Sequence, residues 1–589
     1  MKQTRQTGQG GQARPGRRGR SALALACLLA ILAMAACGGG NATTTTAEAT
    51  TTAAPTTEAT TAAPAGDAAT DATTAAPTTA APTTAAPATT AEAPAQQGFA
   101  ENVTIEIPVY ERAFEGWNVT DNYYTRWIQD SFGTPNNVTV KYVAIGRSTE
   151  VPDYQQMLAA HQAPEIIFHY DMPQALAYYG EGVMQELDYA EIQQYAPTFW
   201  GEMGSTIEQY GSVGGDKVFF FAKRPEADNN VTLLRKDWVE KAGYKVEDLT
   251  SLEKLNEMLL KWKELGLGKL GAKLEQNNFT YSYPFREWPI DEKERALYSD
   301  LSVADFTWKP TEDYLRNLNY QYNNGLVDSE FYLRDDTEAK WKAEFVAGKV
   351  GTLNFYLASN TDAISATLAN DPSAEFALLP PSAGVPEGKQ PQGRGYWPFG
   401  MIMGINYESS DDERIATWML LDWMSQPDNL FTLQNGVAGQ NYALDAQGLA
   451  VKNADYAGDS VMSQNNNKDY WCLVIEGAEY ADPAVTKLSR RINWTVPGYD
   501  DLTDQLFANY DAATPYRTPD ALFTVILPKV AEYKADLNEL WKELYVKCAT
   551  CKEAEFDATY AAAKQEFLDA GYQEILDEKQ AFIDAGDYA

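Results

Sequence analysis

The sequence predicts an α/β protein in which mainly parallel strands alternate with helices. Residues 103–110 alternate apolar and polar side chains, as a strand with one buried face does, and residues 138–145 repeat that alternation. Between them, residues 122–132 place aromatic and aliphatic side chains on one stripe of a helix. Residues 165–170 then form the short apolar run expected of a buried strand. This order of strands and helices is typical of an α/β sheet.

The same alternation continues along the chain, and a second unit begins near Arg224. A stretch rich in Gly, Pro and Gln over residues 380–395 interrupts it, and the C-terminal part is predicted to be mostly helical. The expected elements are strands at 231–234 and 399–405, and helices at 154–160, 173–179, 236–242, 251–265, 411–425, 533–545 and 554–570.

The N-terminal residues have the layout of a secretory signal. The first twenty residues contain several basic side chains and no acidic one, and an apolar run from Ala22 to Met34 follows. This run is shorter than the ~20 residues that a membrane-spanning helix needs. Residues 1–36 are therefore predicted to be a cleaved signal peptide.

Residues 34–37, Met-Ala-Ala-Cys, resemble the bacterial lipobox, in which the cysteine becomes a diacylated N-terminus. Met34 stands where that motif usually has Leu. The resemblance implies lipidation of Cys37, and a protein secreted free after cleavage is the alternative. Two or more acyl chains, at ~0.8 kcal/mol for each buried methylene, would hold the protein durably at the membrane.

Residues 37–98 are predicted to form a tether after the lipidated cysteine. From residue 41 onward the segment is almost entirely Thr, Ala and Pro, a composition that cannot bury a core. Its reach is roughly 40 Å as a flexible coil and about 180 Å as a drawn-out polyproline helix. A domain at its end could work well clear of the membrane.

Charge and motif content exclude several function classes. The formal net charge is −35 and no basic cluster follows the signal segment, so nucleic acid is a poor partner. His161 and His169 are the only histidines, which excludes a histidine-rich metal site, and neither G-x-S-x-G nor H-E-x-x-H occurs. We therefore expect no catalytic residue, metal or cofactor. The 82 acidic residues leave a glycosidase carboxylate pair as an alternative.

Three cysteines remain beyond the anchor. Cys548 and Cys551 form a C-x-x-C pair, whereas Cys472 is distant in sequence. A redox pair and half a metal site are possible readings of such a spacing. In an exported protein, a small structural disulfide between Cys548 and Cys551 is the preferred interpretation.

Four phrases carry a resemblance to a known family. They are Arg235-Lys-Asp-Trp-Val-Glu-Lys-Ala-Gly243, Gly325-Leu-Val-Asp-Ser-Glu-Phe331, Trp341-Lys-Ala-Glu-Phe-Val-Ala-Gly-Lys-Val-Gly-Thr-Leu-Asn354 and Phe567-Leu-Asp-Ala-Gly-Tyr-Gln-Glu-Ile575. In this order they resemble the extracellular solute-binding proteins that supply sugars and related solutes to ATP-binding cassette importers, in the longer branch from Gram-positive bacteria. The resemblance implies a periplasmic-binding-protein-like fold of two α/β lobes joined by crossing strands, with extra C-terminal helices.

The resemblance also implies a domain layout and partners. The expected crossings lie near residues 219–223 and 395–399, with a third after a hairpin at 442–449. The implied bounds are 99–222 and 396–448 for the first lobe, and 223–395 and 449–589 for the second lobe with its C-terminal helices. The implied partners are a small solute, the permease subunits of an importer, and the membrane through the lipid anchor alone. The expected protein is an extracytoplasmic monomer.

Candidate solute-binding residues follow the predicted strands and crossings, because ligands of α/β sheets lie beyond the carboxyl ends of strands. They are Tyr110, Glu111, Arg112, Tyr170, Asp171, Phe220, Asn354, Phe355, Tyr356 and Trp397. Aromatic faces beside carboxylate, amide and guanidinium groups suit a sugar, which favours an oligosaccharide. Ordinary core packing is the competing reading for each ring. A secreted carbohydrate-active enzyme and a cell-surface adhesion protein stay as alternative functions.

Overall fold

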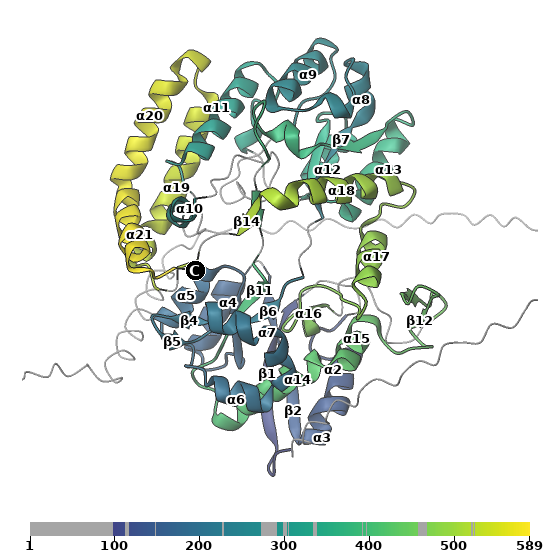
Figure 1. Ribbon diagram of the computed structural model, residues 1–589, viewed down its shortest axis with the longest axis vertical. Coiled ribbons are helices and arrows are strands. Elements are labelled where there is room, and N and C mark those ends of the chain that lie inside the picture. The colour runs from purple at the N-terminus through teal and green to yellow at the C-terminus, as the bar shows by residue number, and fades with distance from the viewer. Residues whose placement is uncertain are drawn as a thin grey trace, which may run out of the picture. The chain divides into compact units, whose positions relative to one another are not determined.

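The structure is a computed structural model, and Gly98–Ala589 forms one compact unit in it (Figure 1). The predicted signal peptide, Cys37 and the tether lie outside the described residues. The structure describes residues 98–111, 117–147, 149–225, 229–271, 291–298, 303, 305–333, 338–391, 393–395, 397–456, 468–519, 522–523 and 525–588.

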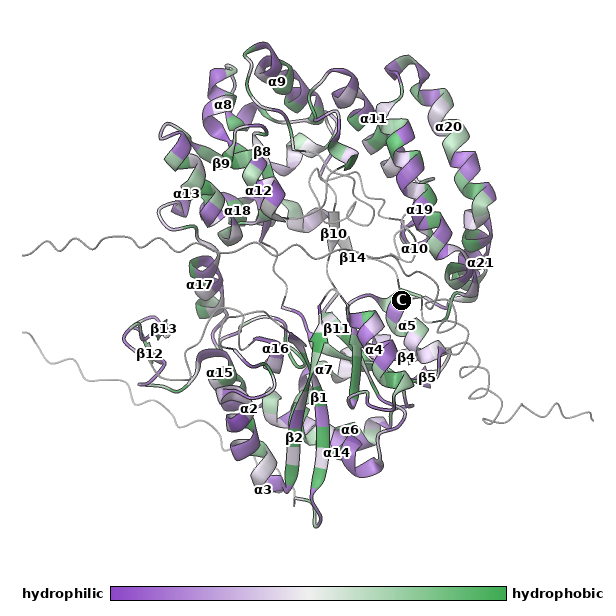
Figure 2. Cartoon of the chain, turned by 180° about the vertical axis from the view of Figure 1, so that it is seen from behind, coloured by the Kyte–Doolittle hydropathy of each residue, from purple (hydrophilic) through white to green (hydrophobic). Residues whose placement is uncertain are grey.

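The first lobe contains a pair of long parallel strands and a separate three-stranded antiparallel sheet. In the pair, β1 (Val103–Glu111) runs beside β2 (Val138–Gly146) in register from Val103↔Val138 to Glu111↔Gly146. In the second sheet, the order is β3 (Ile166–His169), β11 (Phe399–Ile405) and β6 (Phe220–Lys223). Every residue of β11 is buried, and Figure 2 shows green hydrophobic residues along β1 and β11. These strands form the centre of the first core.

Helices complete the first lobe, and local capping explains where two of them begin. The Asn122 side chain accepts a hydrogen bond from the Tyr124 amide at 2.8 Å, and Ser410 forms a capping box with Glu413. The remaining elements are α2 (Tyr123–Ile128), η2 (Gln129–Gly133), α3 (Thr134–Asn136), α4 (Glu150–Ala159), α5 (Met172–Gly180), α6 (Tyr189–Tyr195), α7 (Pro197–Tyr210), β4 (Ser212–Val213), β5 (Asp216–Lys217), α14 (Asp411–Ser425), α15 (Pro427–Asn435), β12 (Tyr442–Leu444), β13 (Ala450–Lys452) and α16 (Lys468–Trp471).

The second lobe is built on an antiparallel sheet with the strand order β8 (Thr352–Tyr356), β7 (Asn230–Arg235) and β9 (Phe376–Leu378). A short parallel pair joins β10 (Gly393–Gly395) to β14 (Arg517–Pro519). The helical elements are α8 (Lys236–Lys241), η3 (Val246–Asp248), α9 (Leu252–Glu264), α10 (Glu292–Tyr298), α11 (Lys309–Asn323), η4 (Phe331–Leu333), α12 (Glu338–Val346), η5 (Ala358–Asn360), α13 (Thr361–Asn370), η6 (Pro381–Gly384), α17 (Pro483–Trp494), α18 (Asp500–Ala513) and η7 (Thr514–Tyr516).

Additional C-terminal helices pack on the second lobe, as predicted. They are α19 (Pro528–Thr550), η8 (Glu553–Glu555), α20 (Phe556–Phe567), η9 (Leu568–Tyr572) and α21 (Gln573–Ala585), drawn in yellow-green to yellow in Figure 1. The chain bends at Gly571, whose φ is +115°. A Cβ there would lie 2.5 Å from Cδ1 of Tyr533, so the bend requires glycine.

One sequence-based expectation about the lobes is wrong. The strands are not mainly parallel, because β11 returns to the first lobe from the second and pairs antiparallel with both β3 and β6. Between the hairpin and the third crossing, the chain still contributes to the first lobe. Residues 470–475 belong to the first core, where Tyr470 stacks on Tyr124 at 5.7 Å and Ile475 forms a parallel bridge with Lys223. The chain leaves the first lobe only after Ile475.

The expected disulfide is also absent, since Cys548 and Cys551 are free thiols in the structure. Cys548 is fully buried in α19, and burial raises the pKa of its thiol to about 12. The Cys551 thiol follows the end of this helix and donates a hydrogen bond to the Cys548 carbonyl oxygen at 3.3 Å. The Cys548 thiol is therefore packed in the core, and the Cys551 thiol is hydrogen-bonded to the backbone. The two sulfurs are not bonded to each other.

Candidate functional site

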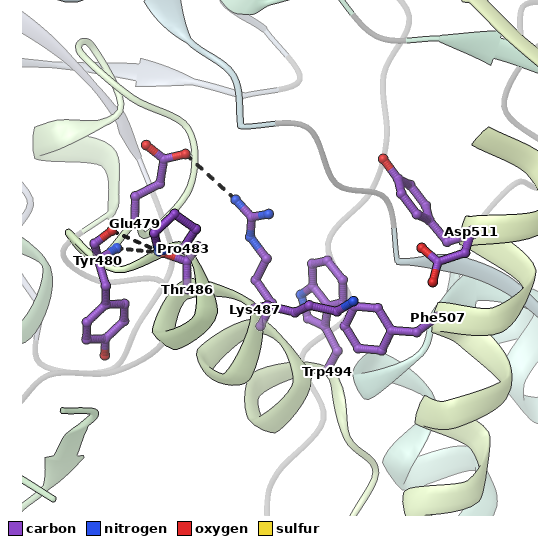
Figure 3. A pocket seen from close by; sticks show the side chains of 10 residues that line it. Glu479, Tyr480, Pro483, Thr486, Lys487, Trp494, Phe507 and Asp511 are labelled. Carbon is purple, nitrogen blue, oxygen red and sulfur yellow. Dashed lines mark hydrogen bonds and ion pairs between the residues drawn. The ribbon is translucent and has the colours of Figure 1, made fainter. Parts of the chain in front are cut away.

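A pocket of about 370 Å³ lies along α17 and α18 (Figure 3). Its walls combine aromatic rings with both signs of charge. The lining residues are Glu479, Tyr480, Pro483, Thr486, Lys487, Arg490, Trp494, Phe507, Tyr510 and Asp511.

The aromatic wall of the pocket is a stacked pair of rings. The centroids of Trp494 and Phe507 are 5.7 Å apart, the ring planes differ by 23°, and both side chains are half-buried. The Lys487 ammonium lies 5.7 Å from the Phe507 centroid, and Figure 3 shows its side chain extending toward that ring. Flat, partly exposed rings beside a cation can hold the apolar face of a polar ligand.

The local sequence explains why these groups share one face of α17. The Asp482 side chain caps the helix by accepting a hydrogen bond from the Ala484 amide at 2.8 Å. Lys487, Arg490 and Trp494 are then spaced by three and four residues, which places them on the same side of an α-helix.

An ion-pair chain connects this pocket to the first crossing. Glu479 accepts a hydrogen bond from Lys223 at 2.9 Å through Oε2, and its Oε1 lies 3.8 Å from Arg490 Nη2. Lys223 ends β6 and also pairs with Glu202 at 3.0 Å. Burial lowers the pKa of Lys223, but the hydrogen bonds to these two glutamates outweigh burial and raise it. The charge on Glu479 is thus held between a crossing strand and the pocket helix.

A second group of rings lies at the carboxyl ends of β1 and β3. Tyr110 and Tyr170 stack with centroids 6.4 Å apart and planes 10° apart, and the Arg147 guanidinium lies 5.0 Å and 5.8 Å from their centroids. The Tyr110 hydroxyl donates a hydrogen bond to Glu150 at 2.5 Å. Burial raises the pKa of Glu150 to about 7, although the hydrogen bond from Tyr110 and the charge of Arg147 lower it.

A third aromatic group lies where β11 begins. Trp397 stacks on Phe399 with centroids 5.9 Å apart and planes 15° apart, and Tyr210 meets the Trp397 ring edge-on at 5.6 Å. Trp397 remains half-buried. The second crossing therefore carries an indole that is supported from behind and partly accessible.

A sequence model of the family described as bacterial extracellular solute-binding protein matches residues 127–437. The chain belongs to this family. This family consists of binding proteins, and membership places the solute-binding protein outside the cytoplasm. No curated protein matches the sequence.

Solved structures share the fold of this solute-binding protein at low sequence identity. Alginate-binding protein AlgQ2 without calcium ion is 16% identical with a TM-score of 0.55, and the match covers 83% of this chain and 99% of that one. The S. pneumoniae substrate-binding protein FusA in complex with kestose is 15% identical (TM-score 0.53, coverage 82% and 99%). An HMO-binding solute-binding protein from Bifidobacterium longum infantis is 12% identical (TM-score 0.56, coverage 82% and 99%). The predicted periplasmic-binding-protein-like fold is confirmed.

The sequence-predicted site residues of this solute-binding protein differ in how exposed they are in the structure. Phe220 is wrong as a ligand contact, because it is fully buried in the first core against Trp418 at 4.8 Å. Tyr110 is only 2% exposed and supports Tyr170 and Arg147 from behind. The remaining predicted residues stay predictions. Glu111, Asp171 and Tyr356 are exposed, Tyr170, Asn354, Phe355 and Trp397 are half-buried, and Arg112 lies outside the described residues.

Sequence reasoning missed the residues that form the pocket. Lys487, Arg490, Trp494 and Phe507 are not among the candidate residues that follow the predicted strands and crossings. The usable signal was the spacing of Lys487, Arg490 and Trp494 along one predicted helix.

Among the described residues, no group of three His, Cys, Asp or Glu side chains could hold a metal ion, and no helix has the length and apolar character of a membrane span.

Proposed function

We propose that this solute-binding protein captures an oligosaccharide and delivers it to an ATP-binding cassette importer. The stacked Trp494–Phe507 pair carries this proposal, because it presents ring faces inside a pocket rimmed by charge. The axial C–H groups of a pyranose pack on such faces. Lys487 and Asp511 can donate to and accept from the same sugar hydroxyls through charge-assisted hydrogen bonds.

The structural neighbours support a saccharide. One is a complex with kestose, one is named as alginate-binding and one as HMO-binding. Support for a saccharide in this chain comes from the ring pair and from the mixed charges of the α17–α18 pocket.

Further parts of the proposal concern location and partners. We propose that Cys37 is lipidated, that residues 37–98 act as the tether, and that a monomer docks on the permease subunits. The predicted contacts Glu111, Arg112, Tyr170 and Asp171 on the first lobe, with Asn354, Phe355, Tyr356 and Trp397, are proposed to contribute beside the pocket. Mass spectrometry of the mature N-terminus tests the anchor directly.

Thermal shift and calorimetry of the 98–589 protein against kestose, maltotriose, xylotriose and an alginate trisaccharide test the proposed function. A bound sugar at a hundred times its Kd stabilises the native state by ~2.7 kcal/mol. Amino acids and dipeptides serve as the negative controls. Product analysis after prolonged incubation should recover the sugar unchanged, whereas cleavage products would support the enzyme alternative. The proposal fails if no saccharide stabilises the protein.

A further inference from the structure

Glu476 lies where the chain leaves the first lobe. Ile475 forms a parallel bridge with Lys223, and the Glu476 amide donates a hydrogen bond to the Lys223 carbonyl oxygen at 2.8 Å. The backbone of Glu476 is thus fixed beside β6 at the third crossing. Its side chain reaches across to β11, the strand of the second crossing.

The carboxylate of Glu476 fits a notch in β11. The register between β11 and β6 shifts between Phe399 and Ile402, and Gly400 lies within this irregularity. A Cβ on Gly400 would lie 1.9 Å from Glu476 Oε1, so the carboxylate occupies the space that any other residue would fill. The Met401 amide hydrogen-bonds to the carboxylate.

One oxygen of this carboxylate has no partner. Glu476 Oε1 is shielded from solvent and accepts no hydrogen bond from the described residues. A buried carboxylate oxygen without a donor is costly, so such an atom calls for a donor that arrives from outside the chain. Burial raises the pKa of Glu476, against the opposing effects of nearby basic residues and the Met401 amide.

The groups around Glu476 indicate which donor would fit. The positive charges of Arg224, Lys468 and Arg147 act on the carboxylate from three separate segments. Three positive charges disfavour a metal cation at this place. Tyr170 is also within electrostatic reach of both Glu476 and Arg147. A neutral polyhydroxyl ligand suits this arrangement, since each hydroxyl can donate to a carboxylate and accept from a guanidinium.

We propose that Glu476 is a solute-binding carboxylate whose Oε1 accepts hydrogen bonds from sugar hydroxyls, with Arg147 and Tyr170 beside the same saccharide unit. This inference rests on the proposed function and adds a subsite formed at the crossings. The Gly400 notch sets the position of the carboxylate and thereby selects which hydroxyls it meets.

Glu476→Gln tests the proposal by isothermal titration with the panel of four saccharides named above. We expect its Kd for the tightest-binding panel member to rise roughly 10- to 100-fold, as for loss of a charged hydrogen-bond partner. Glu165→Gln is the matched control. Glu165 is another buried first-lobe glutamate, but its carboxylate already accepts a hydrogen bond from the Glu106 amide at 2.5 Å. Its Kd should stay within about twofold of wild type.

A second variant and a ligand series distinguish binding from a structural role. Gly400→Ala displaces the carboxylate without changing its charge and should weaken binding to a similar extent. Monodeoxy derivatives of the same saccharide should include one that binds the wild type at least tenfold more weakly but shows no further loss in Glu476→Gln. Wild-type affinity in Glu476→Gln, or equal deoxy penalties in both proteins, would overturn the inference alone. If the wild type binds no panel member, the proposed function fails together with it.

Discussion

Two ring stacks of this protein, Tyr110–Tyr170 and Trp494–Phe507, differ in what covers them. Tyr110 and Tyr170 stack at the ends of strands, with Tyr110 only 2% exposed and hydrogen-bonded to a buried glutamate. Trp494 and Phe507 stack between two helices, and both remain half-buried. Strands at the centre of a lobe bury the first stack, whereas helices that follow a crossing leave the faces of the second accessible. Tyr110 therefore supports the half-buried Tyr170 from behind, whereas both rings of the second stack can contact a solute.

Tyr110→Ala should test the supporting role most severely. Removal of this buried ring leaves a cavity in the first core and orphans the Glu150 carboxylate, so we expect a loss of ~3–5 kcal/mol in the free energy of unfolding. Urea denaturation measures the loss. Tyr110→Phe, which keeps the ring and removes only the hydrogen bond, should lose ~1–3 kcal/mol. A Tyr110→Ala protein as stable as wild type would contradict the supporting role.

Glu150, which is hydrogen-bonded to Tyr110, should make the free energy of unfolding depend on pH. Burial raises its pKa from 4.5 to about 7, so the folded protein holds this proton more tightly than the unfolded chain does. The stabilisation is complete below pH ~4.5 and is lost as the pH rises through about 7, by up to ~3 kcal/mol. Urea denaturation of wild type and Glu150→Gln between pH 4.5 and 8 should show curves that diverge by this amount. Parallel curves would contradict a raised pKa of Glu150 in the folded protein.

Trp494→Ala should weaken sugar binding and leave folding intact. Loss of one ring of the stack should cost ~1–3 kcal/mol of binding free energy, measured by calorimetry with the tightest-binding panel saccharide. The melting temperature without sugar should stay close to wild type, because the ring is only half-buried. Tyr407→Ala, which removes an exposed ring elsewhere on the first lobe, is the control and should leave affinity unchanged. If the Trp494→Ala protein does not fold, the Trp494–Phe507 stack is also part of the core.

Glu479→Gln should have the smallest effect on stability. Its ion pair with Lys223 is about one-third exposed on both sides, which limits its contribution to under ~1 kcal/mol. Denaturation at low and high salt should show this small difference shrinking as screening increases. A loss above about 2 kcal/mol would indicate that the crossing depends on this pair.

The elements with strong periodicity were predictable, and the arrangement of the crossings was not. β1 and β2 follow the alternation of their side chains, and α9 follows its apolar stripe after the Ser251 cap. Phe220 is predicted at a crossing, but it begins β6 and its ring turns into the first core, which the sequence of the crossing does not reveal. The segment before Ile475 has no signal that distinguishes one lobe from the other. Only its contacts with Tyr124 and Lys223 do so.

The candidate site was harder to predict than the fold for a physical reason. Strand ends are visible in a sequence, but the α17–α18 pocket depends on the angle between two helices and on ring stacking across them. The free thiols of Cys548 and Cys551 similarly depend on where α19 ends. Such features arise from tertiary packing, which spacing along the chain does not encode directly.

The notch at Gly400 has a consequence for how this protein can change over evolutionary time. No side chain at position 400 is compatible with a glutamate at position 476 in its present rotamer, so the two positions are free to vary only as a pair. If residue 476 first changes to a shorter side chain, position 400 gains room for a side chain. If position 400 changes first, its new side chain clashes with the Glu476 carboxylate. Related proteins should therefore have glycine at position 400 wherever position 476 is glutamate.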